Sequence, residues 1–170
     1  MKINKGVLTG LLAAAGVALS AVENLFPMPV PAVRLGLSNV PVMAAMYLSN
    51  AKTAFAVLII KAFLSPVFSG NFIFRLSIGL PSALAAFMAM YAIMIILGKK
   101  ISAVSVSVGG AFFYMLVQLA VADIFYIHGI FHSNITGVLL LVATASGMVT
   151  GLLTAKIIEH PSVKQIFTAP

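Results

Sequence analysis

Long apolar segments interrupted by short polar breaks are the feature that most constrains how this chain can fold. A helix needs about 20 apolar residues to cross the hydrocarbon core of a bilayer. Only 8% of the residues are charged and 62% are hydrophobic, whereas a soluble domain carries roughly 25% charged residues. So few charges cannot cover a water-facing surface, so the sequence predicts an all-α integral membrane protein. Five segments reach or approach the required length: residues 6–22, 51–68, 72–97, 104–130 and 135–158.

A sixth apolar segment, residues 35–48, is short for a span, and the charge distribution decides how we interpret it. If all six segments cross and the N-terminus is inside, seven lysines are cytoplasmic and both arginines are outside. If the short segment does not cross, the better orientation gives six cations inside against three outside. The positive-inside bias favours the first arrangement. The cytoplasmic lysines are then Lys2, Lys5, Lys52, Lys99, Lys100, Lys156 and Lys164.

The fold prediction is therefore a six-helix transmembrane bundle with both termini cytoplasmic and a short second helix. Residues 1–158 form a single membrane domain in the lipid bilayer, and residues 159–170 form a short cytoplasmic tail.

The polar residues concentrate in the outer half of this topology, around the proline-rich stretch 23–39. Ionisable residues inside a membrane protein mark functional sites by default. The cations Arg34, Lys61 and Arg75 favour an anionic or carboxylate-bearing small-molecule solute. Taken alone, Arg75 at a helix end is better explained as an anchor at the membrane–water interface. A structural alternative stays open, in which buried ion pairs such as Asp123 with Lys61 fix helix register. The candidate substrate-binding residues are Glu23, Asn24, Arg34, Asn39, Lys61, Gln118 and Asp123.

The sequence lacks the residue patterns that most kinds of enzyme catalysis require. The chain has no cysteine, no phosphate-binding glycine loop with its lysine, and only three carboxylates, so we expect no enzyme activity and no cofactor. A metal-ion permease using Asp123, His128 and His132 is a minor alternative, and we expect no metal site. The net charge of +7 does not indicate nucleic acid, because the cations sit singly or in pairs at the ends of apolar runs.

Small residues recur every four positions along the first segment, at Gly6, Gly10, Ala14 and Ala18. They form a smooth ridge that another helix can approach closely. The ridge either packs inside this bundle or docks another membrane subunit.

Several motifs resemble the Gx transporter family, also labelled heptaprenyl diphosphate synthase component I. They are Glu-Asn-Leu-Phe-Pro-Met-Pro from Glu23, Arg-Leu-Gly-Leu-Ser-Asn from Arg34, the stretch 61–70, and Gly110-Ala111 with Gln118-Leu119. The chain departs from the family pattern at Tyr114-Met115, where the family has His-Asn.

The family is similar to the S components of energy-coupling factor (ECF) transporters in the cell membrane of prokaryotes. The resemblance implies a substrate-binding subunit for uptake, in which the loop between the first two helices covers the solute. A separate energy-coupling membrane subunit with ATPases would dock on the ridge from Gly6 to Ala18. The alternative that the family label implies is a non-catalytic membrane subunit associated with a prenyl diphosphate synthase or a quinone/flavin redox system.

Overall fold

A computed structural model gives the structure of the protein and describes residues 4–23, 25, 36–68, 72–98, 101–126, 128–129, 134–161 and 163. Within these ranges the chain is helical and contains no strand, as the sequence predicts. The elements are α1 (Lys5–Glu23), the 3-10 helix η1 (Leu37–Asn39), α2 (Val40–Leu48), α3 (Ala51–Val67), α4 (Phe72–Leu97), α5 (Ala103–Phe125) and α6 (Asn134–Glu159).

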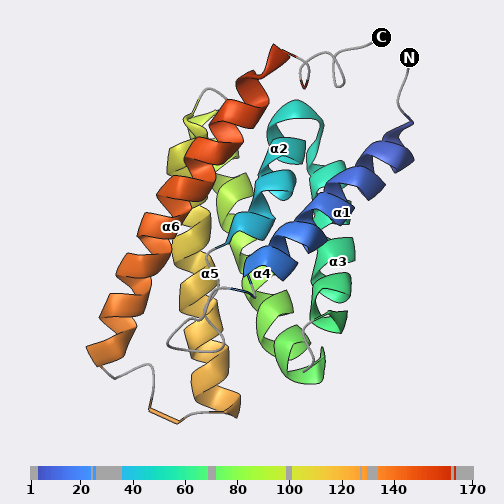
Figure 1. Ribbon diagram of the computed structural model, residues 1–170. Helices are drawn as coiled ribbons and strands as arrows, with labels where there is room; N and C mark the ends of the chain where they lie inside the picture. The colour runs from blue at the N-terminus through green and yellow to red at the C-terminus, as the bar shows by residue number, and fades with distance from the viewer. Residues whose placement is uncertain are drawn as a thin grey trace.

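Successive helices run up and down the bundle (Figure 1). The start of α1, the turn between α2 and α3, and the end of α6 lie at the same end (Figure 1). Lys5, Lys52 and Lys156 are therefore at one end of the molecule, as the charge pattern predicts. Polar side chains cap two of the helices: Asn50 accepts a hydrogen bond from the Thr53 amide at 2.8 Å, and Ser102 accepts one from the Val104 amide at 3.2 Å.

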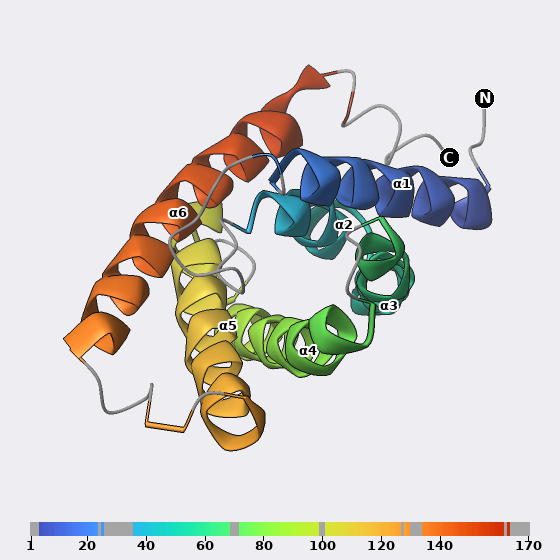
Figure 2. The same cartoon turned by 60° about the horizontal axis from the view of Figure 1, so that its bottom comes forward.

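The shortest α-helix is the most buried one. Seven consecutive residues of α2, from Val40 to Met46, are buried, and α2 packs against α1, α3 and α6 (Figure 2). A helix that is apolar all round suits either a protein core or lipid, and the contacts of α2 with three other helices place it in the core. At 1.5 Å per residue, α2 is far shorter than the ~30 Å hydrocarbon core.

Glycines let α5 approach α6 closely. A Cβ on Gly151 would lie 2.5 Å from the Cα of Val104, and one on Gly147 would lie 3.0 Å from the Cα of Val108. The two glycines are four residues apart and so share one face of α6. This is the close helix contact that small residues permit in membrane proteins.

Four helices are long and apolar enough to cross a membrane by length and composition: α1, α4, α5 and α6. The side chains that face outward from these helices include large apolar ones, such as Met88, Ile96 and Leu141, which suits contact with lipid. The all-helical fold is thus confirmed, and its long apolar helices suit a membrane, whereas six crossings and the orientation of the termini remain predictions. One boundary was wrong: α5 ends at Phe125, not near residue 130.

Candidate binding site

The site is organised around η1, the tight turn that leads into α2. Gly36 precedes this turn with φ of 83°, a left-handed conformation that glycine adopts without the steric cost of a side chain. The Leu37 amide donates a hydrogen bond to Oε1 of Glu23, the last residue of α1. Glu23 is only 5% exposed, so its carboxylate fixes the start of η1 from inside the bundle.

Lys61 of α3 holds the same turn by its ammonium group. Its Nζ donates to Oδ1 of Asn39 at 2.6 Å and to the Ser38 carbonyl at 3.2 Å, and it lies 3.5 Å from the Ser38 hydroxyl. Lys61 is 6% exposed. A cation in a membrane interior needs such oxygen partners, because leaving it on the lipid face costs at least ~2.5–3.5 kcal/mol.

Gly16 makes room for the aliphatic part of Lys61. A Cβ at this position of α1 would lie 3.1 Å from Cδ and 3.3 Å from Cγ of Lys61, and 3.4 Å from the Ser38 carbonyl oxygen. Helix α1 thus contacts the site along its buried face, which carries Ala13, Gly16, Ser20 and Glu23 at helical spacing.

A hollow of about 420 Å³, counting its open mouth, lies beside Lys61; we call it the cationic hollow. Arg75 of α4 also lines it, so two cations from different helices border one space. No carboxylate is among its described lining residues. Its other walls are Gly36, Ser38, Asn39, Ala62, Ser65, Pro66, Gly79, Ala83 and Tyr114.

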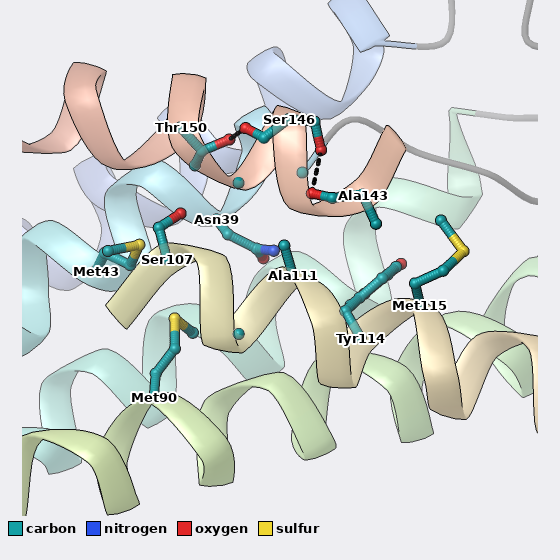
Figure 3. A pocket seen from close by; sticks show the side chains of 13 residues that line it. Asn39, Met43, Met90, Ser107, Ala111, Tyr114, Met115, Ala143, Ser146 and Thr150 are labelled. Atoms are coloured by element: carbon teal, nitrogen blue, oxygen red, sulfur yellow. Dashed lines mark hydrogen bonds between the residues drawn. The ribbon is translucent and has the colours of Figure 1, made fainter. Parts of the chain in front are cut away.

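A second hollow, of about 370 Å³ counting its mouth, shares Gly36, Asn39 and Tyr114 with the first. We call it the apolar hollow, because its described lining contains no charged side chain. Figure 3 shows Asn39 and Met43 on one side of this hollow, Met90 on another, and residues of α5 and α6 around the rest. The remaining lining residues are Ser107, Gly110, Ala111, Met115, Ala143, Ser146, Gly147 and Thr150.

The structure brings together three of the seven predicted site residues at η1: Glu23, Asn39 and Lys61. Gln118 is buried on α5, at 3% exposed, but lines neither hollow, and its Oε1 has no hydrogen-bond partner among the described residues. Asp123 is half-buried near the end of α5 and also lines neither hollow.

Asn24 and Arg34 lie outside the described residues, as does His132. Among the residues that are described, no three histidine, aspartate or glutamate side chains gather as metal ligands would.

The sequence favoured an interface anchor for Arg75, but the structure places this half-buried arginine in the wall of the cationic hollow. Tyr114 and Ser65 are lining residues that sequence reasoning did not select. Nothing in their spacing marks them, since each is one mildly polar side chain in an apolar helix. Only the packing of α3, α4 and α5 around η1 brings them to one place.

The ridge Gly6, Gly10, Ala14 and Ala18 is exposed along the outer side of α1. A Cβ on Gly10 would meet nothing within 4 Å, and one on Gly6 would meet only Oδ1 of Asn4. The ridge therefore does not pack within the described bundle, contrary to the first of the two alternatives drawn from sequence.

These features define a helical membrane protein whose interior holds a polar centre with two cations beside a hollow. The heptaprenyl diphosphate synthase component I family matches residues 12–157, which is most of the chain, and the chain belongs to this family. The match confirms the resemblance drawn from the sequence motifs. Comparisons with curated proteins and with solved structures found no match.

Proposed function

We propose that this chain is a membrane subunit that captures a small anionic solute in the cationic hollow, in the manner of the S components of energy-coupling factor transporters. The observation that carries the proposal is that two cations from different helices, Lys61 and Arg75, line one hollow. A unit anion about 4 Å from one cation gains about 4 kcal/mol at an effective dielectric constant near 20. An anion therefore suits this hollow better than a neutral or cationic solute.

The exposed ridge on α1 supports the proposal that another membrane subunit binds this chain and energises transport. Small side chains at four-residue spacing allow close contact with a helix of another membrane protein, and no described residue occupies this face. We propose that an energy-coupling membrane subunit with ATPases docks here and that the solute enters from the outer side of the cell membrane.

The test is anion binding by purified full-length protein in nanodiscs, measured as thermal stabilisation by phosphate, diphosphate and small carboxylates. Arg75→Gln should weaken the binding of the best anion at least tenfold, because it removes a charge at the hollow. Lys156→Gln is the matched control, because Lys156 is exposed at the end of α6, away from the hollow. Failure of all these anions to bind, or an equal loss in the control, would show that the proposal is wrong.

The family description supports a second candidate: a membrane subunit that associates with a prenyl diphosphate synthase. The residues of the described chain offer no catalytic set for such a reaction, so its role would be to anchor or assist the enzyme. Affinity purification from the native membrane separates the two proposals. Copurification of a synthase supports the second candidate, and copurification of an ATPase-coupled membrane subunit supports transport.

A further inference from the structure

We infer that the first part of α4, residues 72–80, is a hinged gate of the cationic hollow and that Tyr126 holds this gate closed. The inference rests on the proposed function, because a hollow that captures a solute needs a wall that moves. Without its open mouth, the cationic hollow encloses about 30 Å³, which is room for about one or two water molecules. A larger solute therefore enters only when part of the wall swings aside. We call residues 72–80 the α4 gate.

The hinge lies where α4 lacks a backbone hydrogen bond. Pro81 has no N–H group, so the carbonyl of Ser77, four residues earlier, does not receive its usual helical bond. The next residue, Ser82, donates its hydroxyl to the Ile78 carbonyl at 2.7 Å, and such bonds within a helix often bend it. Sharp kinks in helices occur mostly at proline. Helix α4 is therefore easiest to bend at the end of the α4 gate.

Packing against α5 differs on the two sides of this hinge. Beyond the hinge, a Cβ on Gly110 would lie 2.6 Å from Cγ of Met90, and one on Gly109 would clash with Ile93, so α4 and α5 fit closely there. On the α4 gate, a Cβ on Gly79 would meet nothing within 4 Å. The rest of α4 is thus fixed against α5, whereas the α4 gate has open space beside it.

The α4 gate carries part of the wall of the cationic hollow. Arg75 and Gly79 on the gate, and Ala83 beyond the hinge, line the hollow at four-residue spacing and so from one face of α4. Lys61 lines it from α3. A swing of the gate therefore moves Arg75 away from Lys61 and Ala83, and this motion widens the hollow.

Tyr126, the residue after α5, attaches the α4 gate to that helix. Its hydroxyl lies 2.6 Å from Oγ of Ser77. Ser77 donates its own proton to the Phe74 carbonyl at 3.0 Å, so Tyr126 is the donor of this pair. The ring of Tyr126 also meets the ring of Phe74 edge-on, with centroids 4.6 Å apart. Phe74 and Ser77 both belong to the gate, so these contacts break when the gate opens.

The experiment measures opening through a single cysteine, because the chain has none of its own. Ala83→Cys places a thiol in the wall of the cationic hollow, at a side chain that is only 4% exposed. The full chain is held in phosphatidylcholine nanodiscs and treated with 2-sulfonatoethyl methanethiosulfonate, a water-soluble reagent specific for thiols. The rate of modification then reports how often the α4 gate opens.

Two further changes in the Ala83→Cys protein test the parts of the gate. Tyr126→Phe removes the hydroxyl that holds the gate and should raise the rate about two- to tenfold, the effect of one hydrogen bond. Pro81→Ala restores the missing N–H group and should lower the rate at least twofold. Tyr91→Phe is the matched control and should leave the rate unchanged, because Tyr91 lies on α4 beyond the hinge and is 42% exposed, as Tyr126 is.

Equal rates with Tyr126→Phe and Tyr91→Phe overturn the inference, and this comparison decides even if Pro81→Ala does not fold. The inference also fails if Ala83→Cys never reacts in the Tyr126→Phe background while Leu25→Cys, at a position 79% exposed, does. The expected rates in a protein that binds no phosphate, diphosphate or carboxylate support the gate and overturn anion capture. Anion binding with equal rates in the two tyrosine variants overturns the gate and leaves anion capture standing.

Discussion

The contact between α1 and Lys61 gives the sharpest test of how the site is built. Replacing Gly16 by alanine puts a methyl group 3.1 Å from Cδ of Lys61, whereas comfortable carbon–carbon contacts are about 3.5–4.0 Å. The lysine stem therefore has to retreat by roughly 0.4 Å or more. Its Nζ is already 3.2 Å from the Ser38 carbonyl, so any part of this shift that moves Nζ away from the oxygen weakens a long hydrogen bond.

The expected cost follows from these contacts. Overpacking a buried site costs about 1–3 kcal/mol. Alanine also gains roughly 0.5–1 kcal/mol over glycine in a helix, which offsets part of the loss. Gly10→Ala is the matched control, because it has the same backbone gain in the same helix and no atom within 4 Å of the new methyl group. Gly16→Ala should therefore be less stable than Gly10→Ala by about 1–3 kcal/mol.

The assay is thermal unfolding of both variants in nanodiscs. Since the chain has neither tryptophan nor cysteine, melting is followed by circular dichroism. A change of 1 kcal/mol shifts Tm by roughly 2–4 °C for a domain of this size. Gly16→Ala should also weaken anion binding, whereas Gly10→Ala should not. Equal melting temperatures and equal affinities in the two variants would refute the packing of Lys61 against Gly16 and its role in the site.

Two further predictions concern the frame around the site. Gly151→Ala should destabilise the protein by about 1–3 kcal/mol, because the new methyl group would meet the backbone of Val104. Gly137→Ala, on the same helix, is the control, because its methyl group would have no atom within 4 Å. The melting temperatures of the two variants test the difference. Tyr47→Phe removes the hydroxyl that donates to the Ile101 carbonyl at 3.1 Å and should cost about 0.5–1.5 kcal/mol. An unchanged Tm in Tyr47→Phe would show that this link between α2 and the α4–α5 turn contributes nothing.

Much of the scaffold follows from the sequence. Apolar segments long enough to span a bilayer predict helices, because a chain in the hydrocarbon core has few other ways to form hydrogen bonds to all its backbone N–H and C=O groups. A cation on the lipid face is costly, so a lysine within an apolar segment is expected to face the interior, and Lys61 is indeed buried. The family match over residues 12–157 supports the identification made from the stretch that begins at Glu23.

Local sequence did not determine which polar residues share a site. Asp123 and Gln118 resemble Lys61 as polar residues in apolar helices, yet neither lines a hollow, whereas Arg75 and Tyr114 do. Gln118 shares a face of α5 with Tyr114, four residues before it, but lies one turn farther along the helix. Helix packing sets where along and around each helix a hollow lies, and single polar residues do not reveal this.

The sequence by itself determined the class of protein, the helical segments and the burial of Lys61. Each follows from the free energy of transferring an apolar segment or a charge between water and hydrocarbon. The tertiary structure decided that α2 is the buried centre, that Glu23 and Lys61 hold η1, and that the ridge on α1 faces outward. These features depend on side-chain contacts between distant segments. Local hydropathy carries no information about them.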